Sequence, residues 1–276
     1  MRFAKYQGIG NDFVMFADPD DRLRLTPEAV RALCDRRFGI GADGVIRVAP
    51  AADGGDFFMD YVNSDGSLGE MCGNGIRCLA VFAAAEGLTD KAELRVETRA
   101  GLKTVWVADG GIRVDMGPPR FRPEDVPVLW RGDDALHAKV ELDDEVVEVA
   151  CLSMGNAHAV LFVDDLHSVP LTGLGPRIET HAMFPAGTNV EFVVAESAER
   201  IAMSVWERGS GQTLACGTGA CAAAVAARLL RGTRETMTVA MPGGELAVEW
   251  AGSQTDVQPV YMTGPAVKSF EGDVEL

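Results

Sequence analysis

The stretch "TLACGTGACAAAVAAR" (residues 213–228) decides the fold, because a second stretch, "GEMCGNGIRCLAVFAA" (residues 69–84), repeats its pattern. Each stretch sets a cysteine before Gly-x-Gly and then continues into ten or more mostly small, apolar residues. An apolar run of this length, opened by glycines, predicts a helix that begins directly after each cysteine. The chain therefore contains the same cysteine-and-helix unit twice.

The similarity continues on both sides of the two helices at nearly the same offset along the chain. The matching segments show alternating apolar residues, which predict strands, and they end in turn residues or in Gly-Pro. We therefore predict an α+β fold of two pseudo-symmetric halves, residues 1–117 and 118–262, with "GPPRF" (117–121) at the boundary. The matching pairs are 59–66 with 203–210, 94–119 with 237–265 and, more loosely, 8–16 with 153–162.

The two predicted helices differ in how they should be buried. Apolar residues of the first recur at helical spacing and predict one buried face, with Gly87 as the stop. The second carries small residues at nearly every position, which predicts burial on most sides, inside a sheet or barrel. The face predicted for the first helix consists of Ile76, Leu79, Ala80, Ala83 and Ala84.

The position of each cysteine, just before the first helical turn, points to chemistry. Unpaired N–H groups and the helix dipole at that point favour a thiolate, which is a usable base or nucleophile. A single cysteine beside a glycine is more often an inert packing residue. Two cysteines in matching settings, Cys72 and Cys216, instead predict a functional pair.

Composition narrows the class of protein. With 47% apolar residues among 276, the chain can bury a substantial core. Its net charge of −16, from 41 acidic and 25 basic residues, argues against nucleic acid and anionic membranes as partners. The segment "MRFAKYQGIGNDF" (1–13) does not read as a signal peptide, and no apolar run is long enough to span a membrane. We therefore expect a cytoplasmic protein.

The spacing of the cysteines and histidines is not typical of metal ligands. In a reducing cytosol the six cysteines should be thiols, and their local spacings are not the Cys-x2-Cys pairs of zinc sites. The four histidines lack metal-binding spacing as well. We expect no metal, and we interpret Cys34, Cys78, Cys151 and Cys221 as packing residues.

Two cysteines that face one ligand from opposite sides could invert a stereocentre. One thiolate would remove a proton from a carbon while the opposite thiol delivers a proton to the other face. The two helix N-termini would offer N–H donors to a carboxylate and to the charge developing beside it. A racemase of an α-amino acid needs both features and no redox cofactor.

Five motifs closely resemble the diaminopimelate epimerase family, whose members work without pyridoxal phosphate. The resemblance implies two similar halves, each a mixed or antiparallel sheet or barrel around a central helix, with the active site in the cleft between them. Residues 263–276 would return to the first half. We also expect a homodimer. The motifs are "GNDF" (10–13), "MCGNGIRC" (71–78), "MGNAHAV" (154–160), "GTNVEF" (187–192) and "WERGSGQTLACGTGAC" (206–221).

The implied activity is the cofactor-independent conversion of LL-2,6-diaminopimelate into the meso isomer, in lysine and peptidoglycan precursor synthesis. Some members have glutamine where this chain has Gly44. By resemblance, the roles are distributed as follows: Cys72 and Cys216 are the acid/base pair; Gly73, Asn74, Gly217 and Thr218 hold the reacting carboxylate; Glu207 lies near the α-amino group; Asn11, Asn63, Asn156, Asn189 and Arg208 hold the rest of the substrate; His158 and Glu207 tune the cysteines.

Each polar residue also has a simpler interpretation. The asparagines are compatible with turns, Glu207–Arg208 with a solvated ion pair, and His158 with a satisfied core histidine. Two related enzymes remain as alternatives, a proline or hydroxyproline racemase and a phenazine-biosynthesis-like isomerase. A non-catalytic thiol protein that senses redox state or binds metal is the alternative from another class. The occurrence of all these polar residues together with the two cysteine motifs favours the epimerase.

Overall fold

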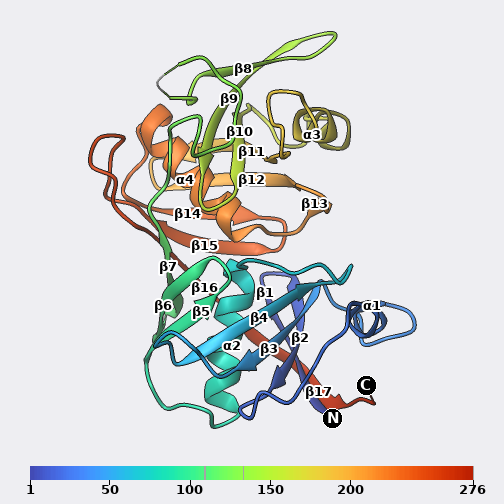
Figure 1. The fold of residues 1–276 in the computed structure, drawn as a ribbon. Helices are drawn as coiled ribbons and strands as arrows, with labels where there is room; N and C mark the ends of the chain where they lie inside the picture. Colours follow the sequence, from blue (N-terminus) through green and yellow to red (C-terminus); the bar gives the residue numbers. More distant parts are fainter. Residues whose placement is uncertain (109, 133, 276) are drawn as a thin grey trace. The chain divides into compact units, whose positions relative to one another are not determined.

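The structure is a computed structural model that describes residues 1–108, 110–132 and 134–275. Its contacts divide the chain into two units (Figure 1). Unit 1 comprises Met1–Asp115 together with Thr263–Leu276, and unit 2 comprises Met116–Met262. The C-terminal segment thus belongs to the same unit as the N-terminus, where the amino group of Met1 donates to the carbonyl of Val274 (2.6 Å).

Unit 1 is a mixed sheet of strands joined in a single series. Its neighbours pair antiparallel, except that β2 with β3 and β4 with β5 run parallel. Alternating burial along β7 shows the period of two that the sequence predicts. The series is β17 (Val267–Asp273), β1 (Arg2–Gly8), β2 (Asn11–Ala17), β3 (Gly44–Ala49), β4 (Phe57–Asn63), β5 (Glu93–Thr98), β6 (Gly101–Ala108) and β7 (Gly111–Gly117).

Unit 2 repeats this scheme. Its neighbours also pair antiparallel, except that β10 with β11 and β12 with β14 run parallel. A short strand, β13 (Gly211–Thr213), adds to β12, and β16 (Val260–Gly264) contains the last residues of the unit. The series is β8 (Ala138–Glu141), β9 (Val146–Ser153), β10 (Ala157–Phe162), β11 (Asn189–Ser197), β12 (Arg200–Glu207), β14 (Thr236–Met241) and β15 (Gly244–Glu249).

The two series match step by step, which confirms the predicted α+β fold with two pseudo-symmetric halves. In each unit an antiparallel pair is followed by a parallel, an antiparallel, a second parallel and a further antiparallel pairing. The chain leaves the sheet for its central helix at the same step, after β4 in unit 1 and after β12 and β13 in unit 2.

Strands of its own unit surround each central helix (Figure 1). In unit 1, α2 (Gly73–Ala85) packs against β1, β2, β3, β4, β6 and β17. In unit 2, α4 (Gly217–Arg231) packs against β9–β12, β14 and β15. Because α4 presents alanines on almost every side, Ala220–Ala227 are all buried, as its composition predicts. Gly232, with φ +68°, ends α4 in the left-handed conformation that favours glycine.

The prediction for α2 is partly wrong. Gly87 follows the helix with φ +68°, as expected of a stop, but Ala84 is exposed. Phe82, Cys78 and the charged Arg77 are buried instead. The helix is enclosed by strands on most sides, so a single apolar stripe does not describe its burial.

Two further helices lie outside these centres. The first, α1 (Pro27–Cys34), begins at Thr26, whose hydroxyl accepts from the N–H of Ala29 (3.2 Å), and it packs against β3. The other, α3 (Leu171–Glu179), packs against β11, β12 and β13. None of the helices in the described residues is both long and apolar enough to cross a membrane.

Candidate active site

Each central helix begins at a cysteine that caps its own first turn. Cys72 has φ −135° and ψ 118°, and its sulfur accepts from the N–H of Gly75 at 3.4 Å. Cys216 has φ −125° and ψ 116°, and its sulfur accepts from the N–H of Gly219, also at 3.4 Å. The two thiols therefore occupy the N-cap position, where backbone donors and the helix dipole stabilise negative charge.

The glycine three residues after each cysteine allows other groups to approach closely. A Cβ on Gly75 would stand 2.7 Å from Cδ1 of Ile46. A Cβ on Gly219 would stand 2.7 Å from Oε1 of Glu191 and 3.2 Å from the sulfur of Cys216. The Cys-Gly-x-Gly pattern thus provides both the capping bond and the space beside the thiol.

In unit 1, the predicted residues Asn11, Cys72 and Asn74 form one group. The Cys72 thiol donates to Oδ1 of Asn11 at 3.6 Å, and the side-chain amide of Asn74 donates to the same oxygen at 3.2 Å. The amide of Asn11 in turn donates to the Asp43 carboxylate at 2.7 Å. Asn11 lies at the start of β2, so this strand places a carbonyl oxygen beside the cysteine. No role for Asp43 is predicted from the sequence.

Arg77, one turn further along α2, holds the first turn of this helix, and sequence reasoning missed it. Its fully buried guanidinium donates to Oδ1 of Asn74 (2.8 Å) and to the carbonyl oxygen of Gly73 (3.0 Å). Both acceptors belong to residues predicted to hold the substrate carboxylate. An arginine within an otherwise apolar helix was the signal that could have indicated it, because buried charges are usually paired.

Asn63 takes part in a separate hydrogen bond at the end of β4. It ends β4, and its amide donates to the Ser67 hydroxyl at 3.0 Å, as in the turn interpretation. Gly44 begins β3, and a Cβ there would stand 2.7 Å from Cε2 of Tyr61 and from the carbonyl oxygen of Val62. This backbone therefore has no room for a side chain at position 44.

In unit 2, the predicted residues form a chain of contacts that begins at Cys216. The sulfur lies 3.5 Å from the Thr218 hydroxyl, which accepts from the Asn156 amide at 3.4 Å. The amide oxygen of Asn156 lies 2.9 Å from Nε2 of His158. On its other side, Nδ1 of His158 lies 2.7 Å from Oε1 of Glu191. The structure thus links Cys216, Thr218, Asn156 and His158, and it adds Glu191.

The His158–Glu191 pair is completely buried, with both side chains at 0% exposure. The two ring nitrogens of His158 face one oxygen each, from Glu191 and from Asn156. Oε2 of Glu191 has no hydrogen-bond partner among the described residues. The signal in the sequence was an acidic residue inside the apolar run of β11, between Val190 and Phe192.

Glu207 and Cys216 influence each other. Burial raises the pKa of the Glu207 carboxyl, although hydrogen bonds from Thr213 and Cys216 oppose this effect. Burial also raises the pKa of the Cys216 thiol well above its usual range, and the carboxylates of Glu207 and Glu191 add to the rise. Cys216 is therefore held as a thiol in this structure.

Asn189 and Arg208 lie together at the ends of neighbouring strands. The buried amide of Asn189 donates to the carbonyl of Ala157 (2.9 Å), and its oxygen accepts from the backbone N–H of Arg208 (3.0 Å). The exposed guanidinium of Arg208 donates to the carbonyl oxygen of Ala186 at 3.1 Å. Among the described residues, no carboxylate lies within ion-pair distance of Arg208, so the solvated ion pair with Glu207 is not formed.

The remaining cysteines are packing residues, as predicted. All four are buried, and burial raises the thiol pKa of Cys34 to about 11 and of Cys78 and Cys151 to about 12. None of the six cysteines is in a disulfide. Within the residues that the structure describes, no group of three or more His, Cys, Asp or Glu side chains could hold a metal ion.

Solved structures with a similar fold come from several groups of proteins. A phenazine biosynthesis protein of the PhzF family from Bacillus anthracis matches with a TM-score of 0.73 at 17% identity, covering 100% of this chain and 99% of that one. A probable proline racemase from Agrobacterium radiobacter K84 matches with a TM-score of 0.71 at 16% identity, covering 100% and 93%. At these identities the likeness establishes the fold alone.

Sequence relatives establish the family. A sequence model of the family described as diaminopimelate epimerase matches residues 3–122 and 150–269. A diaminopimelate epimerase from Laribacter hongkongensis is 49% identical over 280 residues, covering 100% of this chain and 99% of its own length. One from Desulfitobacterium hafniense is 46% identical, covering 99% and 97%. The chain belongs to the diaminopimelate epimerase family.

Proposed function

We propose that this protein epimerises LL-2,6-diaminopimelate to the meso isomer, with Cys72 and Cys216 as the two acid/base groups. The observation that carries the proposal is the pair of cysteine caps, which share backbone angles and the 3.4 Å bond to a glycine N–H. Membership of the family supports the substrate. The product serves lysine and peptidoglycan precursor synthesis.

The chemistry uses groups of this chain alone. One cysteine thiolate takes the α-proton, and the opposite thiol gives its proton to the other face of the same carbon. The negative charge that develops on the α-carbon and its carboxylate is stabilised by backbone N–H groups at the first turns of α2 and α4, which include Gly73, Asn74, Gly217 and Thr218. No step needs pyridoxal phosphate, a metal or a redox cofactor.

We assign the two cysteines different roles in the LL-to-meso direction. Burial and two neighbouring carboxylates raise the pKa of Cys216, which supports a role as the proton donor in the resting site. Cys72 is then the base. It is half-buried, and its sulfur sits between the Gly75 N–H and the oxygen of Asn11. After one turnover the roles are exchanged, so the reverse reaction begins with Cys216 as the base.

The remaining residues recognise a substrate with an ammonium and a carboxylate at each end. Glu207, next to Cys216, suits the reacting ammonium, whose positive charge would favour ionisation of this carboxyl. Arg208 has a guanidinium without a carboxylate partner among the described residues, so it suits the distant carboxylate. Asn11 and Asn156 supply further polar contacts. Asn63 and Asn189 use their side chains within the fold here, so their roles toward substrate are the least supported.

The direct test is to incubate the protein with LL-diaminopimelate in deuterated water. We expect the meso isomer to form with deuterium at one α-carbon, because the donor thiol exchanges its proton with solvent. Chromatography that separates the isomers, followed by mass spectrometry, measures both outcomes. Failure to form the meso isomer, or efficient turnover of proline in a parallel assay, would overturn the proposal.

We also propose that the enzyme acts in the cytoplasm, where its cysteines stay reduced. Treatment of intact cells with a thiol reagent that cannot cross the membrane should leave both active-site cysteines unmodified. The homodimer stays a prediction, and light scattering during size-exclusion chromatography tests it. A mass near that of one chain would contradict it.

A further inference from the structure

The segment that leads into Cys72 is held from outside by another part of unit 1. Residues 69–72 have no regular secondary structure and connect the bridge at Leu68 to the first turn of α2. The carbonyl oxygen of Gly69 accepts from the Arg99 guanidinium at 3.0 Å. The carbonyl oxygen of Glu70 accepts from the backbone N–H of Ala100 at 3.3 Å. Both donors lie in the turn between β5 and β6.

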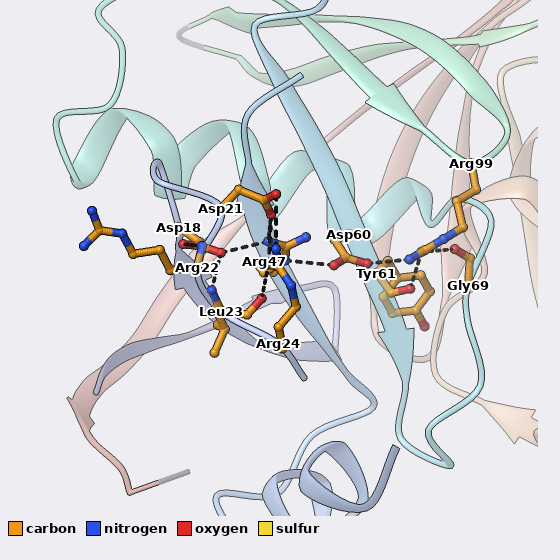
Figure 2. Close-up of polar contacts among 10 residues, drawn as sticks. All are labelled: Asp18, Asp21, Arg22, Leu23, Arg24, Arg47, Asp60, Tyr61, Gly69 and Arg99. Atoms are coloured by element: carbon orange, nitrogen blue, oxygen red, sulfur yellow. Dashed lines mark hydrogen bonds and ion pairs between the residues drawn. The ribbon is translucent and has the colours of Figure 1, made fainter. Parts of the chain in front are cut away.

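Arg99 joins this segment to strand β4. The nitrogen that contacts Gly69 also donates to the carbonyl oxygen of Tyr61 at 2.8 Å, and a second nitrogen binds the Asp60 carboxylate (Figure 2). The same Tyr61 oxygen accepts from the backbone N–H of Gly69 at 3.0 Å. The planar guanidinium supplies several donors in a fixed geometry, so one side chain fixes the strand and the segment together.

Arg99 is the last member of a row of alternating charges. Asp60 lies directly opposite Arg47 on the neighbouring strand and accepts from its Nε at 2.8 Å. Arg47, whose side chain is only 11% exposed, also binds Asp18 (2.8 Å) and Asp21 (2.6 Å) (Figure 2). Arg47 therefore supports Asp60 without touching the segment that leads to Cys72.

The Tyr61 ring, against which residues 69–72 begin, leaves the backbone at Gly69 little room to move. A Cβ on Gly69 would stand 2.2 Å from Cδ1 of Tyr61, so the backbone lies directly on that ring. The ring of Tyr61 in turn packs edge-on against Phe13, with 5.8 Å between ring centroids. Only glycine fits this contact. A small displacement of residue 69 would therefore lift the segment from the Tyr61 ring and also move Cys72, which follows three residues further along the chain.

We propose that Arg99 is a positioning residue for Cys72. It holds the carbonyl oxygen of Gly69 against the end of β4, so that the Cys72 sulfur stays on the N–H of Gly75 and beside Asn11. This inference rests on the proposed role of Cys72 as an acid/base group. Arg99 acts through the backbone and does not need to touch substrate.

The experiment compares Arg99→Gln with Arg47→Gln in the full-length protein. The first removes the bonds to both carbonyl oxygens, and the second removes a less exposed arginine from the same charge row but leaves those bonds in place. The readouts are the rate of Cys72 alkylation by iodoacetamide, the melting temperature and the steady-state kinetics. Trypsin releases Cys72 in a peptide (residues 48–77, or 38–77 in Arg47→Gln) that contains no other cysteine, so mass spectrometry follows this thiol alone.

We expect Arg99→Gln to slow Cys72 alkylation by about two- to fivefold, the size of a lost interaction with a helix N-terminus. Cys216 alkylation, followed in the same sample, should not change. Because misplacing a reacting group by about 1 Å can cost up to about 100-fold, kcat should fall by about 10- to 100-fold with KM nearly unchanged. Arg99→Lys should recover part of both losses.

Arg47→Gln should lower the melting temperature at least as much as Arg99→Gln does. It should nevertheless leave Cys72 alkylation and kcat near their wild-type values. Unchanged Cys72 alkylation in Arg99→Gln would overturn the inference, and so would an equal slowing in Arg47→Gln. Alkylation and melting need no substrate. A wild-type protein that fails to epimerise diaminopimelate would therefore refute the proposed function without deciding the role of Arg99.

Discussion

Replacing Arg208 by lysine should weaken recognition of the distant carboxylate of diaminopimelate. In the structure, the Asn189 side chain holds the backbone of Arg208, and the guanidinium reaches the carbonyl oxygen of Ala186. Its stem lies close to Gly187, where a Cβ would stand 3.0 Å from Cδ of Arg208. The guanidinium has donors left for a carboxylate after the bond to Ala186, and it presents them as a planar fork.

A lysine keeps the charge but loses this fork. Its ammonium cannot bind the Ala186 carbonyl and both oxygens of a carboxylate in the same geometry, so one hydrogen bond to a charged group is lost. Such a bond contributes about 1.5–3 kcal/mol. We therefore expect kcat/KM for diaminopimelate to fall by about 10- to 150-fold, because each 1.4 kcal/mol corresponds to a factor of ten.

The assay measures kcat/KM for diaminopimelate and for an analogue that lacks the distant carboxylate, in wild type and in Arg208→Lys. The wild type should be slow on the analogue, and the substitution should hardly change that rate. Arg200→Lys is the matched control, because Arg200 begins β12, the strand that Arg208 directly follows, and forms surface ion pairs with Glu196 and Glu245, which contribute little. Equal losses on both substrates would show that Arg208 is structural and would refute this reasoning.

Three further predictions concern the cysteines. Cys72→Ala and Cys216→Ala should each lower kcat by at least about 10²- to 10⁴-fold, the usual effect of removing a general acid or base, and near-normal epimerisation by either variant would contradict the two-base reaction. Air oxidation should inactivate the enzyme through a Cys72–Cys216 disulfide that a thiol reductant reverses, whereas peptide maps with both thiols free would argue against it. Because the Glu191 carboxylate raises the pKa of Cys216, Glu191→Gln should lower that pKa, so that alkylation of Cys216 begins at lower pH than in wild type; an unchanged pH profile would exclude this effect.

The sequence by itself determined the features that depend on neighbouring residues. Cysteine before Gly-x-Gly predicted two helix starts, and both thiols cap their helices because an N-cap bond joins residues only three positions apart. The alanine-rich composition of α4 predicted its burial, since small side chains let strands approach from all directions. The internal repeat predicted equivalent halves, and the two series of strand pairings agree.

Only the tertiary structure decided which distant polar groups meet. Glu191 reaches His158 because β10 and β11 run parallel and in register, and Arg99 reaches Gly69 because the β5–β6 turn lies beside the segment that follows β4. The tertiary structure also decided that the Asn189 side chain bonds to the backbone. Periodicity along the chain records which side of an element is buried, but not which residues of other elements lie opposite. Partners so far apart in sequence are selected by strand register and packing, which no local pattern encodes.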